Sequence, residues 1–167
     1  MDDGKDVPEW FGKPILIMGC GNPLLGDDGF GPAVVEALRE RGVPANVYIL
    51  NAGSSAREIL FPMVVGDTRV ERLIIVDAVD LRNRGRVPGE VFEMPVDDLP
   101  LVKVDDFSMH QIPSSNLLRD LRDHHKVKVI VLACQIGSIP DYVAPGLSEP
   151  VRNAVERMCD MVSGYWR

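Results

Sequence analysis

Four short runs of consecutive apolar residues recur along the chain. They cover residues 14–18, 47–50, 73–76 and 129–132. A strand with one face in water alternates apolar and polar residues. These runs do not alternate, so they predict strands buried on both faces of a mostly parallel sheet. Residues 89–94 do alternate, which predicts an edge or antiparallel strand.

Segments with helical spacing lie between these runs. They are 31–41, a segment from Ser54 or Ser55 that bends or ends near Pro62, 114–123, and a last helix with Ser148 as N-cap and Pro150 in its first turn. Serine at the N-cap and proline in the first turn are typical helix starts. The alternation of strands and helices predicts an α/β fold of three layers.

Length and composition restrict the possibilities further. The 167 residues predict a single domain over 13–167 after an N-terminal tail over 1–12. The net charge is −7, from 18 Lys and Arg against 25 Asp and Glu, which argues against a nucleic-acid surface or an anionic membrane surface. The first ten residues do not read as a signal peptide, and no apolar run is long enough to span a membrane.

The three cysteines, Cys20, Cys134 and Cys159, are too scattered for a disulfide framework or a metal knuckle. They predict reduced thiols in a cytoplasmic protein. Cys134 follows the last buried strand and is a possible nucleophile, but no histidine lies near it in the sequence.

The loop after the first strand carries acids where nucleotide-binding loops carry other residues. Residues 19–31 read GCGNPLLGDDGFG. Leu24 interrupts the Rossmann glycine fingerprint, and Asp27 and Asp28 stand where a P-loop has Lys and Ser or Thr. Carboxylates repel a phosphate, so this loop favours a cation or the backbone amides of a peptide. Alternatively, one of these acids only caps the helix that follows.

Other polar residues follow the remaining strands. Asn51 follows the second strand and Asp77 the third, while His110 lies on a predicted loop before a helix. In such sheets ligands bind beyond the carboxyl ends of the strands. Asp28, Asp77 and His110 together offer two carboxylates and an imidazole, a donor set that suits nickel or zinc better than calcium or magnesium.

Each of these residues also has a simpler interpretation. Asn51 is a common turn residue, Asp77 can hold a neighbouring loop through backbone amides, and a loop histidine such as His110 is usually just solvated. His124 and His125 are explained by the end of a helix, where a positive charge is favourable.

Taken in order, these segments resemble the [NiFe]-hydrogenase maturation endopeptidases. The matching segments are GCGNPLLGDDGFGP at 19–32, NAGS at 51–54, LIIVDA at 73–78, SMHQ at 108–111 and GLSEPV at 146–151. The resemblance covers about residues 14 to 162 and is closest to the branch that serves coenzyme F420-reducing or formate-hydrogenlyase-type hydrogenases.

The resemblance implies a fold, a reaction and a site. The implied fold is an α/β/α sandwich with a five-stranded, mostly parallel mixed sheet of the phosphorylase/hydrolase-like kind. The implied reaction is removal of the C-terminal extension from a hydrogenase large-subunit precursor after nickel insertion. Asp28, Asp77 and His110 match the family's metal-contacting and catalytic positions. The nickel comes with the substrate, and zinc or cadmium is expected to replace it in vitro.

We also expect Gly21, Asn22, Asn51, Gly53 and Gln135 to contact the substrate. Asn51 departs from the family pattern, which usually has aspartate there. The sequence leaves open whether the metal polarises the peptide carbonyl, whether it activates a water, or whether a carboxylate acts as base.

Two alternatives belong to other classes of protein. The Asn51 departure leaves room for a non-catalytic, nickel-dependent chaperone of the large subunit. A receiver-like signalling module also has acids after its first and third strands. In that fold the acids follow the strand directly, and a lysine follows the last strand, where this chain has Cys134 and Gln135.

Overall fold

A computed structural model describes residues 8–99 and 115–167. These residues form five strands, β1 Ile15–Cys20, β2 Val47–Gly53, β3 Arg72–Val79, β4 Val91–Met94 and β5 Lys128–Gln135. They also form the helices α1 Phe30–Arg41, α2 Ala56–Val65, α3 Ser115–His124 and α4 Glu149–Ser163. The strands and helices predicted from the apolar pattern are confirmed, with ends that differ by a few residues.

The five strands form one sheet in the order β2-β1-β3-β5-β4. β1, β2, β3 and β5 run parallel, and β4 pairs antiparallel with β5 at one edge. This matches the alternating pattern of residues 89–94, because an antiparallel edge strand tolerates polar residues on one face. The topology differs from a receiver-like module, whose sheet is parallel with the order 2-1-3-4-5.

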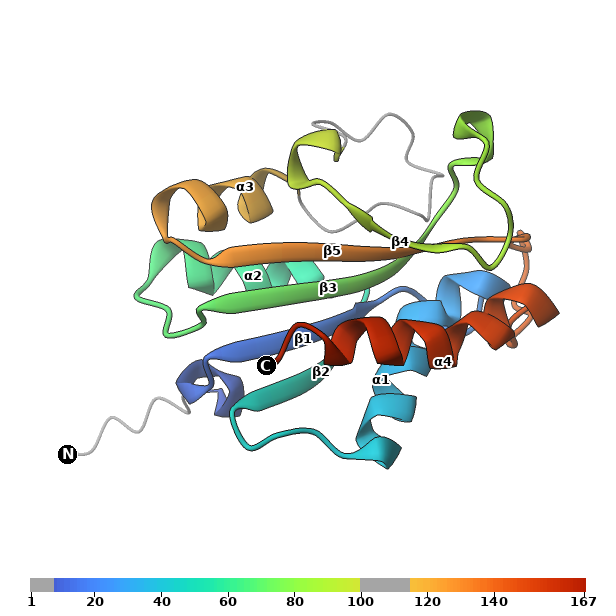
Figure 1. Cartoon of the computed structure of the whole chain (residues 1–167). Helices are drawn as coiled ribbons and strands as arrows, with labels where there is room; N and C mark the ends of the chain where they lie inside the picture. The colour runs from blue at the N-terminus through green and yellow to red at the C-terminus, as the bar shows by residue number, and fades with distance from the viewer. Residues whose placement is uncertain (1–7, 100–114) are drawn as a thin grey trace.

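Helices cover both faces of the sheet, as Figure 1 shows. On one face α1 and α4 pack against strand residues such as Ile17, Val76 and Leu132. On the other face α2 and α3 pack against residues such as Met18 and Ile75. The predicted three-layer α/β/α sandwich is therefore confirmed, and alternate residues of each strand face opposite helix layers.

The segment predicted to be a tail joins this core in part. Glu9–Gly12 forms a short 3-10 helix, η1, and Trp10 is buried in the layer of α2 and α3. The folded part of the chain therefore begins before residue 13. None of the helices among the described residues is both long and apolar enough to cross a membrane.

Candidate active site

Asp28 lies in the loop that follows β1, on the short 3-10 helix η2 (Gly26–Gly29). Its side chain is buried, and the Asn22 N–H donates a hydrogen bond to Asp28 Oδ2 at 2.7 Å. Gly21 allows this close packing, because a Cβ there would lie 1.9 Å from the Asp28 carbonyl oxygen. Gly21 also has φ +121°, which side chains rarely adopt. The loop residues thus fix Asp28 over the end of β1.

Asp77 lies near the carboxyl end of β3, one residue beyond the last pair between β1 and β3, Gly19 with Val76. From β1 the chain goes to β2 on one side, and then crosses to β3 on the other. The gap between the ends of β1 and β3 is therefore the switch point at which α/β sheets bind ligands. Asp77 is buried, and its own Oδ1 accepts a hydrogen bond from the Ala78 N–H at 2.8 Å.

The two acids influence each other. Burial raises the pKa of Asp77 well above its ordinary range; the hydrogen bond from Ala78 opposes this rise, and the charge of Asp28 adds to it. Burial and the charges of Asp77 and Asp28 also raise the pKa of the Cys20 thiol. The raised pKa leaves the Cys20 thiol protonated at neutral pH. A cation beside Asp28 and Asp77 would relieve the repulsion between these two acids, so the arrangement suits a positively charged ligand.

Asp27 has a different role from its neighbour. Its buried carboxylate accepts hydrogen bonds from the Gly137 N–H (2.8 Å), the Ser138 N–H (3.1 Å), and the N–H (2.7 Å) and hydroxyl (2.8 Å) of Ser148. It therefore ties the loop after β1 to the loop between β5 and α4. The N-cap of α1 is Gly29, with no side-chain hydrogen bond, so the alternative that Asp27 or Asp28 caps this helix is wrong.

Sequence reasoning missed this role of Asp27. Its partners lie 110 to 121 positions further along the chain, and no spacing rule connects residues that far apart. Ser148 is the N-cap of α4, as predicted, but its hydroxyl bonds to Asp27 rather than to the helix.

Four of the predicted substrate contacts lie where β1 and β2 end. Gly21 N–H donates to the Gly53 carbonyl at 3.0 Å, and Gly19 pairs with Asn51. Asn51 is exposed, and its Oδ1 accepts from the Gly53 N–H at 3.1 Å, which closes a turn. Asn22 adjoins Asp28, so these residues border the side of the acid pair nearest β2.

Gln135, the fifth predicted contact, is fully buried in the chain. Its Oε1 accepts from the Leu81 N–H at 2.6 Å, and its Nε2 donates to Asp80 Oδ1 at 3.1 Å and to the Ile136 carbonyl at 2.9 Å. Because these bonds use its amide, Gln135 stabilises the turn after β3 and does not face a substrate in this structure.

Cys134 is also unsuited to the nucleophile alternative. Its thiol is fully buried, and burial, with the charge of Asp27, raises its pKa to about 12. A thiol in that state is protonated at neutral pH and has little nucleophilic character.

His110 lies outside the described residues, so its predicted place beside the acids stays a prediction. His124 and His125 lie at the end of α3, within 2.9 Å and 3.6 Å of Asp120. Over residues 8–99 and 115–167, no three His, Cys, Asp or Glu side chains come together in a group that could hold a metal ion.

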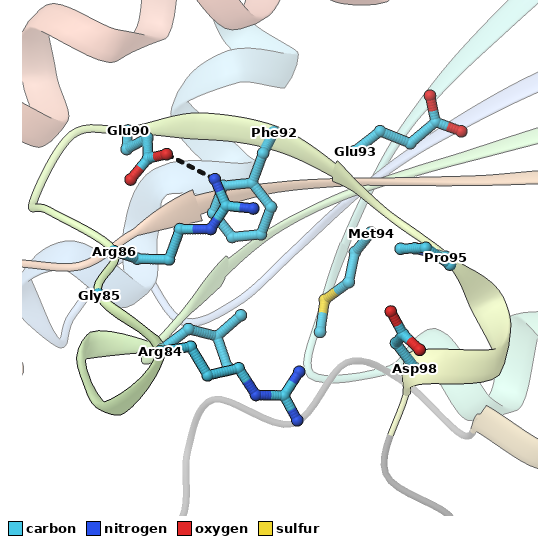
Figure 2. Close-up of a pocket in the computed structure, with 10 residues that line it drawn as sticks. Arg84, Gly85, Arg86, Glu90, Phe92, Glu93, Met94, Pro95 and Asp98 are labelled. Atoms are coloured by element: carbon cyan, nitrogen blue, oxygen red, sulfur yellow. Dashed lines mark hydrogen bonds and ion pairs between the residues drawn. The ribbon is translucent and has the colours of Figure 1, made fainter.

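A separate pocket of about 350 Å³ lies along β4, and Figure 2 shows its lining. Arg86 is 3.8 Å from the centre of the Phe92 ring and pairs with Glu90 at 2.5 Å, while Arg84 lines the lower wall. Among the described residues, none of the predicted site residues lines this pocket, so the acid pair and the pocket are different features.

Comparisons with known proteins agree on one family. A family model described as hydrogenase maturation protease matches residues 32–164. A Methanocaldococcus jannaschii protein assigned as a hydrogenase maturation protease is 40% identical over 155 residues, covering 91% of this chain and 96% of its own. The delta subunit of coenzyme F420 hydrogenase from Methanothermobacter thermautotrophicus is 33% identical, covering 89% of this chain and 91% of its own.

A solved structure gives the same result. The hydrogenase maturating endopeptidase HybD from Escherichia coli superimposes with a TM-score of 0.70 and 28% sequence identity. The match covers 89% of this chain and 88% of that one, so the likeness extends over nearly the whole fold.

Proposed function

Because this chain belongs to the hydrogenase maturation protease family, we propose that it removes the C-terminal extension of a [NiFe]-hydrogenase large-subunit precursor after nickel has been inserted. The observation that carries the proposal is the buried pair Asp28 and Asp77 at the switch point of the sheet of a family member. The similarity to the F420 hydrogenase delta subunit favours a substrate from an F420-reducing hydrogenase.

In this proposal the nickel arrives with the precursor, and Asp28, Asp77 and His110 contact it. Two carboxylates and an imidazole suit nickel, and they would also accept zinc or cadmium in vitro. The raised pKa of Asp77 supports the idea, because a buried acid beside another acid is stabilised in its charged form by an incoming cation. A nickel-free precursor lacks that charge, so the site would discriminate loaded from unloaded substrate.

The chain's own residues then position the peptide. Asn22 holds Asp28 and Ala78 holds Asp77, so both carboxylates keep a fixed orientation as the substrate docks. Gly21, Asn22, Asn51 and Gly53 border the same edge and would contact the peptide beside the metal. Either the nickel polarises the scissile carbonyl or activates a water, or one carboxylate removes a proton from the attacking water.

The remaining assignments follow from this role. We assign the protein to the cytoplasm, where precursor subunits are made. The net charge of −7 fits a protein partner rather than nucleic acid.

The test uses purified large-subunit precursor in nickel-loaded and nickel-free forms, incubated with the protein and analysed by intact mass. We expect the loaded precursor to lose a C-terminal peptide and the nickel-free precursor to stay whole. Equal cleavage of both forms would contradict the nickel-sensing role. Binding without any cleavage would favour the chaperone alternative instead.

A further inference from the structure

Three large apolar side chains are exposed on the loop after β1 and on the loop between β5 and α4. Leu24 is 50% exposed, Tyr142 69% and Val143 68%. We call these three residues the apolar lip. Exposed apolar residues are common when scattered, but a group on neighbouring loops at one edge of a sheet usually marks a contact surface.

Backbone pairing brings Leu24 and Val143 of the lip together from two distant segments, and Tyr142 adjoins Val143 in the chain. Leu25 and Ala144 form a parallel bridge, in which the Ala144 N–H donates to the Leu24 carbonyl and the Gly26 N–H to the Ala144 carbonyl, each at 2.9 Å. Leu24 and Val143 each precede a residue of this bridge. Because side chains alternate along paired backbone, both project to the same side, away from the half-buried Leu25 and Ala144.

The loops that carry the lip are held firmly. Asp27 bonds to Gly137, Ser138 and Ser148, which anchors both ends of the segment containing Tyr142 and Val143. Gly26 packs so close to Pro140 that a Cβ at Gly26 would lie 2.8 Å from the proline ring. The apolar side chains are thus displayed on a fixed support, which lowers the entropy lost when a partner binds.

The lip is also directly connected to the candidate active site. The Leu24 N–H donates to Asn22 Oδ1 at 3.0 Å, and the Asn22 N–H donates to Asp28 Oδ2 at 2.7 Å. Leu24 and Asp28 thus belong to one hydrogen-bonded loop, and a protein that brings its metal to Asp28 would lie against this loop.

We propose that the apolar lip docks the large-subunit precursor, through an apolar surface of that subunit next to its nickel. The inference rests on the proposed function, since it takes the precursor as the partner. It adds that binding of the partner depends on contacts outside the acid pair.

The test measures binding and cleavage separately. The affinity of purified nickel-loaded precursor is measured by isothermal titration calorimetry for wild type and for a Leu24→Ser, Tyr142→Ser, Val143→Ser triple variant. We expect the triple variant to bind about tenfold more weakly or worse, since loss of apolar side chains at the centre of an interface has effects of this size. Exposed positions tolerate serine well, and circular dichroism checks the fold.

A matched control comes from α2. Phe61 and Val65 are 51% and 66% exposed, and a Phe61→Ser, Val65→Ser variant should bind as wild type does. The single variant Tyr142→Ser should lose less affinity than the triple variant. Tyr142→Phe, which keeps the aromatic ring, should bind as wild type does.

Unchanged affinity in the triple variant, or an equal loss in the α2 control, overturns the lip as a docking surface. Absence of binding by wild type overturns it as well. If wild type binds through the lip but does not cleave, the docking surface stands and the proposed endopeptidase function fails.

Discussion

Asp77 combines a cost in stability with the role in the site that we propose, and replacement by asparagine separates the two. Burial raises its folded-state pKa above the unfolded value, so the folded protein binds this proton more tightly. The contribution of Asp77 to the free energy of unfolding is therefore fully present below the ordinary pKa of aspartate, and it is lost as the pH rises toward the raised pKa. Asp77→Asn carries no charge at any pH. Without divalent metal it should melt higher than wild type at pH 8, and the two melting curves should converge at low pH.

The same variant should process nickel-loaded precursor about a hundredfold more slowly or worse, because a charged ligand or base is lost. Exposed Asp67→Asn is the control and should change neither property. A variant that is no more stable than wild type at pH 8 would contradict the burial argument. Full processing by a folded Asp77→Asn protein would remove Asp77 from the site.

Sequence reasoning could select Asp28 and Asp77 because each follows a buried strand, where α/β folds bind ligands. The spacing alone could not separate Asp27 from Asp28, since adjacent acids in a glycine-rich loop have the same pattern; the choice of Asp28 rests on the family resemblance. One of these side chains faces β3 and the other faces the β5–α4 loop. Their directions depend on the backbone angles at Gly21 and Gly26, both of which have positive φ.

At the scale of elements, Asp27 is the residue that joins η2 to the start of α4. Asp27→Ala removes the carboxylate that accepts from three backbone N–H groups and one hydroxyl, in part-buried hydrogen bonds. We expect this change to lower the free energy of unfolding by about 3 kcal/mol, since several hydrogen bonds to one charged group are lost together. Urea denaturation at fixed pH measures the loss.

The control for Asp27 is an acid that pairs at the surface. Asp97 is 74% exposed in its ion pair with Arg122, so Asp97→Ala should change the unfolding free energy by less than about 1 kcal/mol. An Asp27→Ala protein as stable as Asp97→Ala would show that the loops hold together without the carboxylate.

The elements themselves were largely predictable, because each strand and helix has a local periodicity that packing then preserves. The alternation at 89–94 even indicated which strand is antiparallel. Contacts between elements were not predictable in this way. Trp10, placed in a tail by the polar residues around it, is buried because η1 packs against the sheet.

At the scale of the whole molecule, the two ends of the parallel strands carry different residues. Asp77 lies near the carboxyl end of β3. Lys128, the first residue of β5, pairs with Arg72, the first residue of β3, at the opposite end. His125 comes just before this start of β5, and so does His124 at the end of α3. The topology therefore separates both histidines from the acid pair by the length of the strands.

His110, which lies outside the described residues, therefore remains the histidine that we propose for the site. The sequence contains three histidines, and the other two are at the wrong end of the sheet. His110→Ala should abolish nickel-dependent processing, because the substrate metal loses its only imidazole contact in the proposed site. A His124→Ala, His125→Ala double variant should process the precursor at the wild-type rate. Intact mass reports cleavage, and circular dichroism verifies that each variant is folded. Normal processing by folded His110→Ala would show that the two carboxylates are sufficient without an imidazole. Loss of processing in the double variant would mean that α3 affects the site from the opposite end of the strands.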